Sequence, residues 1–492
     1  MNRIDLPILH TEMDQVNREK YSSTTTLTAI ELEVFPELAQ AQWLANMMSP
    51  SLWKWEENLP KRRGGSPVRR KVEEIKQYLI HAYEFCHMEE YPGLCPSGLT
   101  DIETEDARFP DSPQKQKIFQ ELRNIFLHGS STVLAELLQV NSVREYYRLM
   151  DYPKNMIPRW GNETIDKMDA YKHISRSGLG AGKCQSLALL YASALIILGR
   201  FPWQNVAVLW FSPSHVMTYL KEGEGYLASN KRIFSAVSLQ NINEHTSVVK
   251  SCLEKEKLSH VQMIFGNIHD ALPHYSIDRG DLDSLYLHLE NYAASGNASP
   301  SNFWTSPKEK TYIPFPWPTI DFSGVQSAES LQNIVYDYAR KFPGSIYDLA
   351  MYAFRCIDVK YPEIYAYTAK NRSSRIKDLG LETVEQMLEY AQNQFSWDSI
   401  FPSPDRIALP DEVILFQRGT HRDRALLLYA LLANKFPHQE PFLVFTKTQS
   451  FVLWNGILLP VQPNFHETEE IFLLFNSQGS VKAPDFNTAC FS

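Results

Sequence analysis

The chain has 492 residues, which exceeds one ordinary hydrophobic core, and domains of about 100–200 residues predict about two to four of them. Hydrophobic residues make up 44% of the sequence and charged residues 21%, which is typical of a folded globular protein rather than a disordered one. The formal net charge of −9 argues against binding to nucleic acid, because the phosphate backbone is recognised by a surface rich in lysine and arginine.

One basic run stands out against this acidic balance, from Lys61 to Lys71 (KRRGGSPVRRK). The Gly-Gly-Ser-Pro segment at its centre predicts a solvated loop that leads into a helix, and anion binding is the alternative interpretation.

No feature of the sequence predicts a membrane segment or an oxidising compartment. The N-terminus lacks the apolar core of a signal peptide. The longest apolar stretch, Leu187 to Leu198, is shorter than the roughly 20 residues that cross a bilayer. The 6 cysteines are scattered without the short spacings of a disulfide framework. We therefore expect a cytoplasmic protein with no membrane partner.

Residues 1–150 are expected to form a helical N-terminal region. Apolar residues recur at helical spacing in Val72–Glu84, Phe119–Leu127 and Ser131–Val140. Prolines at 92, 96, 110 and 113 interrupt the helical pattern between the first two of these segments.

A different pattern begins in residues 151–240. The run Cys184–Leu198 (CQSLALLYASALIIL) predicts a buried helix, which Gly199 ends. Three β-rich runs follow: Val206–Phe211, His215–Leu220 and Tyr226–Asn230, with Gly223 and Gly225 forming the turn before the last. The order predicts an α+β fold in which a helix packs on an antiparallel meander.

Residues 241–340 are expected to connect this region to a further one. Ile242–Glu254 has a weak helical pattern, and residues 295–320 are rich in Ser, Asn and Pro, as surface connections are. Helices are predicted again at Leu331–Arg340, Ile346–Cys356 and Val384–Phe395.

An internal repeat links residues 151–240 to residues 341–480. The segment Gly182–Gln204 matches Thr420–Gln439, because both contain a Leu-Leu-Tyr-Ala helix followed by Phe-Pro and a β-rich run. We interpret the pair as a tandem duplication. In the second copy Cys184 aligns with Arg422, His215 aligns with Phe451, and Asn230 falls near Val461 or Gln462. The second copy therefore keeps the apolar pattern and lacks the polar residues.

Cys184, His215 and Asn230 fit the requirements of a cysteine nucleophile. The N-terminus of a helix lowers the pKa of a thiol through its dipole and free N–H groups, and Cys184 starts the predicted helix. His215, at the start of a strand, can serve as the base, and Asn230 on the next strand can orient the imidazole. Glu222 and Glu224 lie in the intervening turn and are expected to face solvent.

The glycine-rich lead Ser177–Lys183 (SGLGAGK) is expected to leave room for a substrate carbonyl beside Cys184. The Cys184 N–H can donate to the oxyanion that develops there. Trp160, Gln185 and Gln204 are candidates for a second donor.

These residues resemble the transglutaminase-like (papain-like cysteine protease) superfamily. The resemblance rests on Gly182-Lys183-Cys184-Gln185-Ser186, the LALLYASAL helix, Ser214-His215-Val216 and Asn230, and it covers roughly residues 160–235 with a degenerate echo at 385–465. It implies acyl-enzyme chemistry on an amide of a peptide, a protein or a small molecule, without cofactor or metal. The family often has an aromatic residue after the histidine and an aspartate as third member, where this chain has Val216 and Asn230.

Other interpretations of the same residues remain open. Cys184 alone can be a small buried hydrophobe, His215 a core histidine and Asn230 a turn residue. GLGAGKC lacks the spacing and the Ser/Thr of a phosphate loop, and His81, Cys86, His87 and Cys95 lack the paired spacing of a zinc site. A non-catalytic interaction protein on the same fold is the alternative function.

Overall fold

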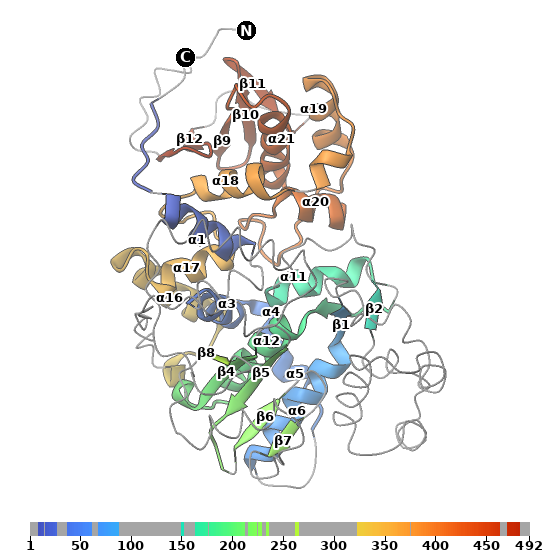
Figure 1. Cartoon of the computed structure of the whole chain (residues 1–492), viewed down its shortest axis with the longest axis vertical. Coiled ribbons are helices and arrows are strands. Elements are labelled where there is room, and N and C mark those ends of the chain that lie inside the picture. Colours follow the sequence, from blue (N-terminus) through green and yellow to red (C-terminus); the bar gives the residue numbers. More distant parts are fainter. Residues whose placement is uncertain are drawn as a thin grey trace, which may run out of the picture. The chain divides into compact units, whose positions relative to one another are not determined.

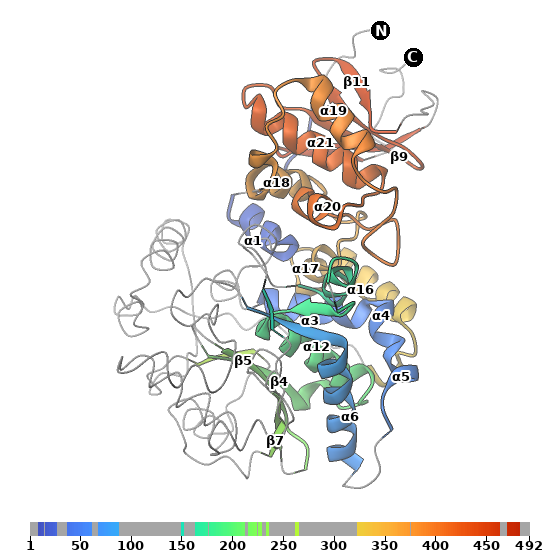
Figure 2. The same ribbon diagram turned by 90° about the vertical axis from the view of Figure 1, so that its right-hand side faces the viewer.

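A computed structural model describes fourteen segments of the chain (Figures 1 and 2), and every structural statement below concerns these residues. The segments are 8–13, 15–26, 37–61, 67–87, 149–151, 163–175, 177–211, 215–223, 225–228, 233–235, 261–264, 322–373, 375–462 and 470–482. The predicted helices at 119–127, 131–140 and 242–254 lie outside them.

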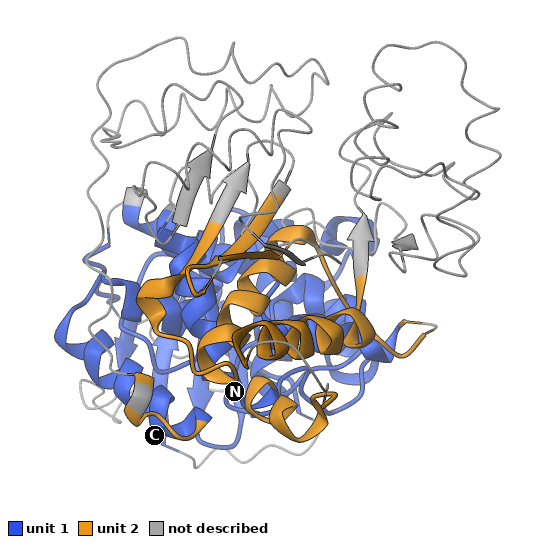
Figure 3. Cartoon of the chain, turned by 90° about the horizontal axis from the view of Figure 1, so that it is seen from below, with its two compact units in different colours: residues 1–51, 155–174, 328–492 blue, residues 52–154, 175–327 orange. Residues whose placement is uncertain are grey.

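The chain forms two compact units, each assembled from separate stretches of sequence (Figure 3). Unit 1 comprises Met1–Ser51, Asn155–Ile174 and Ala328–Ser492, and unit 2 comprises Leu52–Lys154 and Ser175–Ser327. The four continuous ranges expected from the sequence remain predictions. Helix α4 (Pro50–Trp53) contains the boundary between the first stretch of unit 1 and the first stretch of unit 2.

Unit 2 contains helix α12 (Cys184–Ile197) and a five-stranded sheet of order β7-β6-β5-β4-β8 (Figure 1). Strands β4 (Val206–Phe211), β5 (His215–Leu220), β6 (Tyr226–Ala228) and β7 (Ile233–Ser235) form an antiparallel meander, and β8 (Val261–Ile264) pairs parallel to β4. The predicted helix, the first two predicted strands and the start of the third are confirmed. Gly223 and Gly225 have φ of 59° and 75°, so both make the left-handed turn before β6.

A smaller sheet of order β2-β1-β3 completes the strands of unit 2. Strands β2 (Leu149–Asp151) and β3 (Gly180–Gly182) both pair parallel to β1 (Tyr83–His87). The other described elements of unit 2 are the helices α5 (Trp55–Asn58), α6 (Pro67–Ala82), η2 (Trp203–Asn205) and η4 (Phe322–Gly324). Helix α6 confirms the helix predicted within Val72–Glu84, except that Tyr83 and Glu84 belong to β1.

Helix α12 is buried on every side, as its run of apolar residues predicts. It also packs on α6, where the Tyr191 hydroxyl donates to the Val72 carbonyl at 2.9 Å. Gly199 follows its C-terminus, and a Cβ there would lie 2.3 Å from the Leu195 carbonyl oxygen and 2.5 Å from the Phe201 ring. The chain can therefore leave the helix along this path only with glycine.

Unit 1 also combines helices with one five-stranded sheet, of order β11-β10-β9-β12-β13. The strands, all antiparallel, are β9 (Phe442–Thr446), β10 (Ser450–Trp454), β11 (Ile457–Pro460), β12 (Ile471–Phe475) and β13 (Ser480–Lys482). Helix α21 (His421–Lys435) precedes β9 and packs on β9 and β10. As in unit 2, a helix is followed by three strands that occupy neighbouring places in the sheet, in chain order.

The remaining helices of unit 1 come from three parts of the sequence. They are α1 (Gln15–Thr25), α3 (Glu37–Met48), α11 (Ile165–Ala170), η1 (Tyr171–His173), α16 (Ala328–Lys341), α17 (Ile346–Ala353), α18 (Glu363–Arg372), η5 (Arg375–Asp378), α19 (Val384–Asn393) and α20 (Pro410–Phe416). Helices α16, α17 and α19 confirm the three helices predicted in this stretch.

Paired charges are buried in unit 1. The Arg406 guanidinium lies 2.7 Å from Asp166, and both side chains are almost fully buried. Glu412 is shared by Arg355 and Lys167, each at 2.8 Å. Ionised groups without water are tolerated only when paired in this way, so these contacts join α11 to the chain around α20.

The mixture of helices with mainly antiparallel sheets agrees with the predicted α+β class. In the part of the chain that the structure describes, no helix combines the length and the apolar character needed to cross a bilayer.

Candidate functional site

Cys184 is the first residue of α12, as predicted. Lys183 occupies the N-cap position with extended backbone (φ −79°, ψ 170°), and its side chain makes no capping hydrogen bond. The first N–H groups of a helix have no partner within the helix, so here they are available to a neighbouring acceptor. The thiol of Cys184 is free and the residue is partly exposed.

Strand β5 lies against the first turns of α12. The Thr218 hydroxyl, buried at 1% exposure, donates to the Ala188 carbonyl at 2.7 Å. A second contact lies beside this one. Cys184 is one helical turn before Ala188, Val216 is two residues before Thr218, and the Val216 N–H donates to the Cys184 sulfur. Four residues of helix span about 6 Å and two residues of strand about 7 Å, so the helix and the strand stay in step across both contacts.

Burial raises the pKa of the Cys184 thiol above its ordinary value. The Lys183 charge and hydrogen bonds from the N–H groups of Val216, Gln185 and Cys184 lower the pKa in opposition, without cancelling the effect of burial. The resting thiol is therefore mainly protonated near neutral pH, and its ionisation needs a base. When the sulfur does become charged, N–H groups from both α12 and β5 are already in place to stabilise it.

His215 is the first residue of β5, opposite Phe211 of β4, and it directly precedes the residue whose N–H contacts the Cys184 sulfur. Its side chain lies outside the described residues. Asn230 also lies outside them, between Ala228, which ends β6 opposite Thr218, and Ile233, which starts β7. The structure therefore brings Cys184 to Val216, the residue after His215, and the roles of all three residues stay predictions.

The three candidates for a second oxyanion donor have different outcomes. Gln185 is the second residue of α12 and is 8% exposed, whereas Trp160 lies outside the described residues. Gln204 is exposed, and the expectation for it was wrong. The carbonyl of its neighbour Asn205 accepts a hydrogen bond from the Lys221 N–H, just after the C-terminal end of β5. His215 is at the N-terminal end of β5, roughly 17 Å away along the strand, so Gln204 lies far from the proposed base.

One local expectation near the site was wrong, and one neighbouring segment has a structure that the sequence did not predict. Glu222, expected to face solvent, is half-buried and accepts a hydrogen bond from the Asn205 side chain at 2.6 Å. The glycine-rich lead, expected to leave room for a substrate carbonyl, contains the buried strand β3, whose Gly180–Gly182 backbone pairs with β1. A phosphate-binding loop needs these backbone N–H groups free, so the segment does not have that form.

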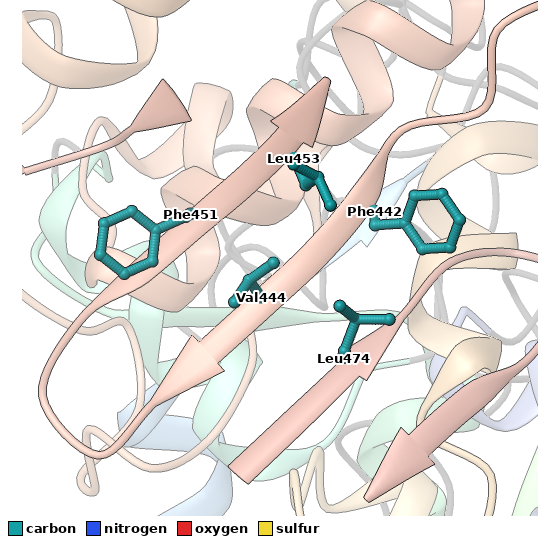
Figure 4. Close-up of a cluster of buried hydrophobic side chains, with 5 residues drawn as sticks. All are labelled: Phe442, Val444, Phe451, Leu453 and Leu474. Carbon is teal, nitrogen blue, oxygen red and sulfur yellow. The ribbon is translucent and has the colours of Figure 1, made fainter. Parts of the chain in front are cut away.

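In unit 1 the counterparts of the trio lack a thiol. Arg422 pairs with Asp405 at 3.1 Å, and Phe451 belongs to a buried apolar cluster on the sheet with Phe442, Val444, Leu453 and Leu474 (Figure 4). The start of α21 and the start of β10 nevertheless make a polar contact, as the starts of α12 and β5 do in unit 2. His421 Nδ1, on the first residue of α21, lies 2.8 Å from the hydroxyl of Ser450, the first residue of β10.

Asp423 in the first turn of α21 fixes the helix start of unit 1. It forms a capping box with Thr420, and its carboxylate also accepts the Ala408 N–H at 2.8 Å. Burial raises the pKa of Asp423 to about 6. Within the described segments, no group of three or more His, Cys, Asp or Glu residues is placed to hold a metal ion.

Comparison with known proteins returned no match among family models, curated proteins or solved structures.

Proposed function

We propose that this chain is a cysteine-dependent hydrolase or acyltransferase of the transglutaminase-like kind, acting on amides through an acyl-enzyme on Cys184. The observation that supports it best is the environment of the Cys184 sulfur. Helix α12 supplies the N–H groups of Cys184 and Gln185, and β5 supplies the N–H of Val216. Donors from two elements around one sulfur are the arrangement that a thiolate and a neighbouring oxyanion need.

The proposed base is His215, because it directly precedes Val216 in β5. Since burial raises the pKa of the Cys184 thiol, attack requires proton transfer to the imidazole as the sulfur bonds to the substrate carbonyl carbon. The negative charge moves to the carbonyl oxygen, which the Cys184 N–H can stabilise. Collapse expels the amine, which takes the proton from the imidazolium and leaves a thioester. Water or an amine then attacks the thioester and releases Cys184.

The proposed orienting residue is Asn230. It follows β6 by two residues, and the last residue of β6, Ala228, pairs with Thr218 in β5. The chain therefore leaves β6 toward the end of β5 that carries His215. An amide oxygen that accepts the second imidazole N–H would hold the tautomer in which the other nitrogen takes the thiol proton.

The transglutaminase-like fold is part of the proposal. In support, α12 and the β4-β5-β6 meander have the order of a helix packed on an antiparallel sheet, and α21 with β9-β10-β11 repeats that order in unit 1. We infer that the second copy is inactive, because its helix starts with His421 and Arg422. The free thiols of Cys184 and Cys356 fit a cytoplasmic site of action.

The proposal is tested by measuring the rate at which iodoacetamide labels each cysteine, by peptide mass spectrometry, between pH 5 and 10. We expect Cys184 to react at pH 7 at least about tenfold faster than Cys356, and His215→Ala to remove that advantage, since a positioned base contributes about 10²–10⁴-fold. Cys356 is the matched control, because burial raises its pKa to about 11. Equal rates for the two cysteines in the wild type would instead favour a non-catalytic interaction protein.

A further inference from the structure

Gln185 is one of several buried amides in the described residues whose side-chain oxygen lacks a hydrogen bond; Gln40, Gln42 and Gln462 of unit 1 are others. Gln185 directly follows Cys184 in the first turn of α12, and 8% of its surface is exposed. Its Oε1 atom is buried and has no hydrogen-bond partner. Tyr191 and Ser193 on the same helix do have partners, the carbonyl oxygens of Val72 and Leu189.

An unpaired buried amide oxygen lowers the stability of a fold by about 1–3 kcal/mol, because the group has lost water and gained nothing in return. A methionine or leucine would fill the same space without that cost. The folded chain alone therefore gives no reason for an amide at this position. Unsatisfied polar groups of this kind are expected where a ligand completes the hydrogen bonding.

The location of Gln185 indicates which ligand. Its backbone N–H hydrogen-bonds the Cys184 sulfur, so its main chain already forms part of the thiol environment. The side chain starts from the same residue, next in sequence to Cys184 in the first turn of α12. An amide substrate carries an N–H donor one bond from that carbon, and a buried carbonyl oxygen is a suitable acceptor for it.

We propose that Gln185 is a substrate-binding residue, whose Oε1 accepts a hydrogen bond from the N–H of the amide at Cys184. The inference rests on the proposed nucleophilic role of Cys184 and specifies its substrate class. The site selects primary and secondary amides, which carry this N–H, over esters and tertiary amides, which lack it. Rejection of a ligand that leaves a buried polar group unpaired is a strong source of specificity.

The test compares 2-iodoacetamide with 2-iodo-N,N-dimethylacetamide, in which two methyl groups replace both N–H hydrogens of the amide. The ratio of their labelling rates at Cys184 is measured in the wild type and in Gln185→Met. Dividing one ratio by the other removes the intrinsic reactivities of the reagents. We expect the ratio to fall about three- to tenfold in Gln185→Met, which is the effect of losing one hydrogen bond. The ratio at Cys356 should not change.

The matched control is Gln40→Met in α3, because the Oε1 of Gln40 is also buried without a partner and this residue belongs to unit 1. Both variants should keep or raise the melting temperature, and only Gln185→Met should change the labelling ratio. An unchanged ratio, or a lower melting temperature in Gln185→Met, overturns the inference. If labelling of Cys184 does not depend on His215, the proposed function fails; if it does and the ratio is constant, only the role of Gln185 fails.

Discussion

The contact between Thr218 and Ala188 gives the most direct test of how unit 2 positions its thiol. The substitution Thr218→Val keeps the side-chain shape and removes the hydroxyl that donates to the Ala188 carbonyl at 2.7 Å. A buried hydrogen bond of this kind contributes about 0.5–1.5 kcal/mol net. The lost bond has little further cost, because a carbonyl inside a helix is already an acceptor for the helix itself. We therefore expect a loss of ~1 kcal/mol, or about 2–4 °C in melting temperature for a unit of this size.

The same substitution should also change the chemistry of Cys184. The Thr218 hydroxyl and the Val216 N–H are successive contacts between β5 and α12, so weakening one loosens the other. With a weaker Val216 contact, the pKa of the thiol rises further, and the pH of half-maximal iodoacetamide labelling moves upward. Ser193→Ala is the control, because it removes a 2.7 Å hydrogen bond to Leu189 that lies wholly within α12. A Thr218→Val protein with wild-type stability and an unchanged labelling midpoint would refute this account.

Three further substitutions test other parts of the fold, by urea unfolding in each case. Gly199→Ala should lower the free energy of unfolding by about 1–3 kcal/mol, because its Cβ would meet the preceding helical turn, whereas Gly324→Ala, with open space around it, should have little effect. Arg406→Met should cost about 3–5 kcal/mol, since it leaves the buried Asp166 carboxylate without its counter-ion, and adding Asp166→Asn should recover part of the loss. Burial raises the pKa of Asp423 in the folded state to about 6, so the protonated side chain stabilises the fold below pH 4 and this stabilisation is lost as the pH rises through 6. The free energy of unfolding should therefore fall by up to ~3 kcal/mol between pH 4 and 6 because of this residue, and Asp423→Asn should remove that fall. A pH profile that is identical in the two proteins would contradict the last expectation.

Local patterns in the sequence predict α12, β4 and β5 well. The apolar run CQSLALLYASALII predicts a buried helix, and β-branched and aromatic residues mark the two strands that follow. Cys184 at the helix start and His215 at the strand start follow from those boundaries. Strand β3 escaped prediction, because Gly-Ala-Gly has no strand propensity and its pairing with β1 joins residues nearly one hundred positions apart.

The orphaned Oε1 of Gln185 could not be found from sequence either. The sequence shows a glutamine on a predicted buried helix. Whether its side-chain oxygen has a hydrogen-bond partner depends on every segment that surrounds it, and only the tertiary structure shows those. The same holds for Gln204, which has the right side chain and lies at the wrong end of β4.

The order of hydrophobic and polar residues, by itself, determines the elements that carry Cys184 and His215, because a helix and a hairpin obtain their hydrogen bonds from nearby residues. The tertiary structure decides what the sulfur contacts. The Val216 N–H reaches Cys184 because β5 packs against α12, where the Thr218 hydroxyl also donates to the Ala188 carbonyl, and burial there raises the pKa of the thiol above its ordinary value. It also decides the composition of the two units, in which residues 1–51 join residues 328–492. Pairings between distant segments depend on packing over the whole fold, which no local pattern encodes.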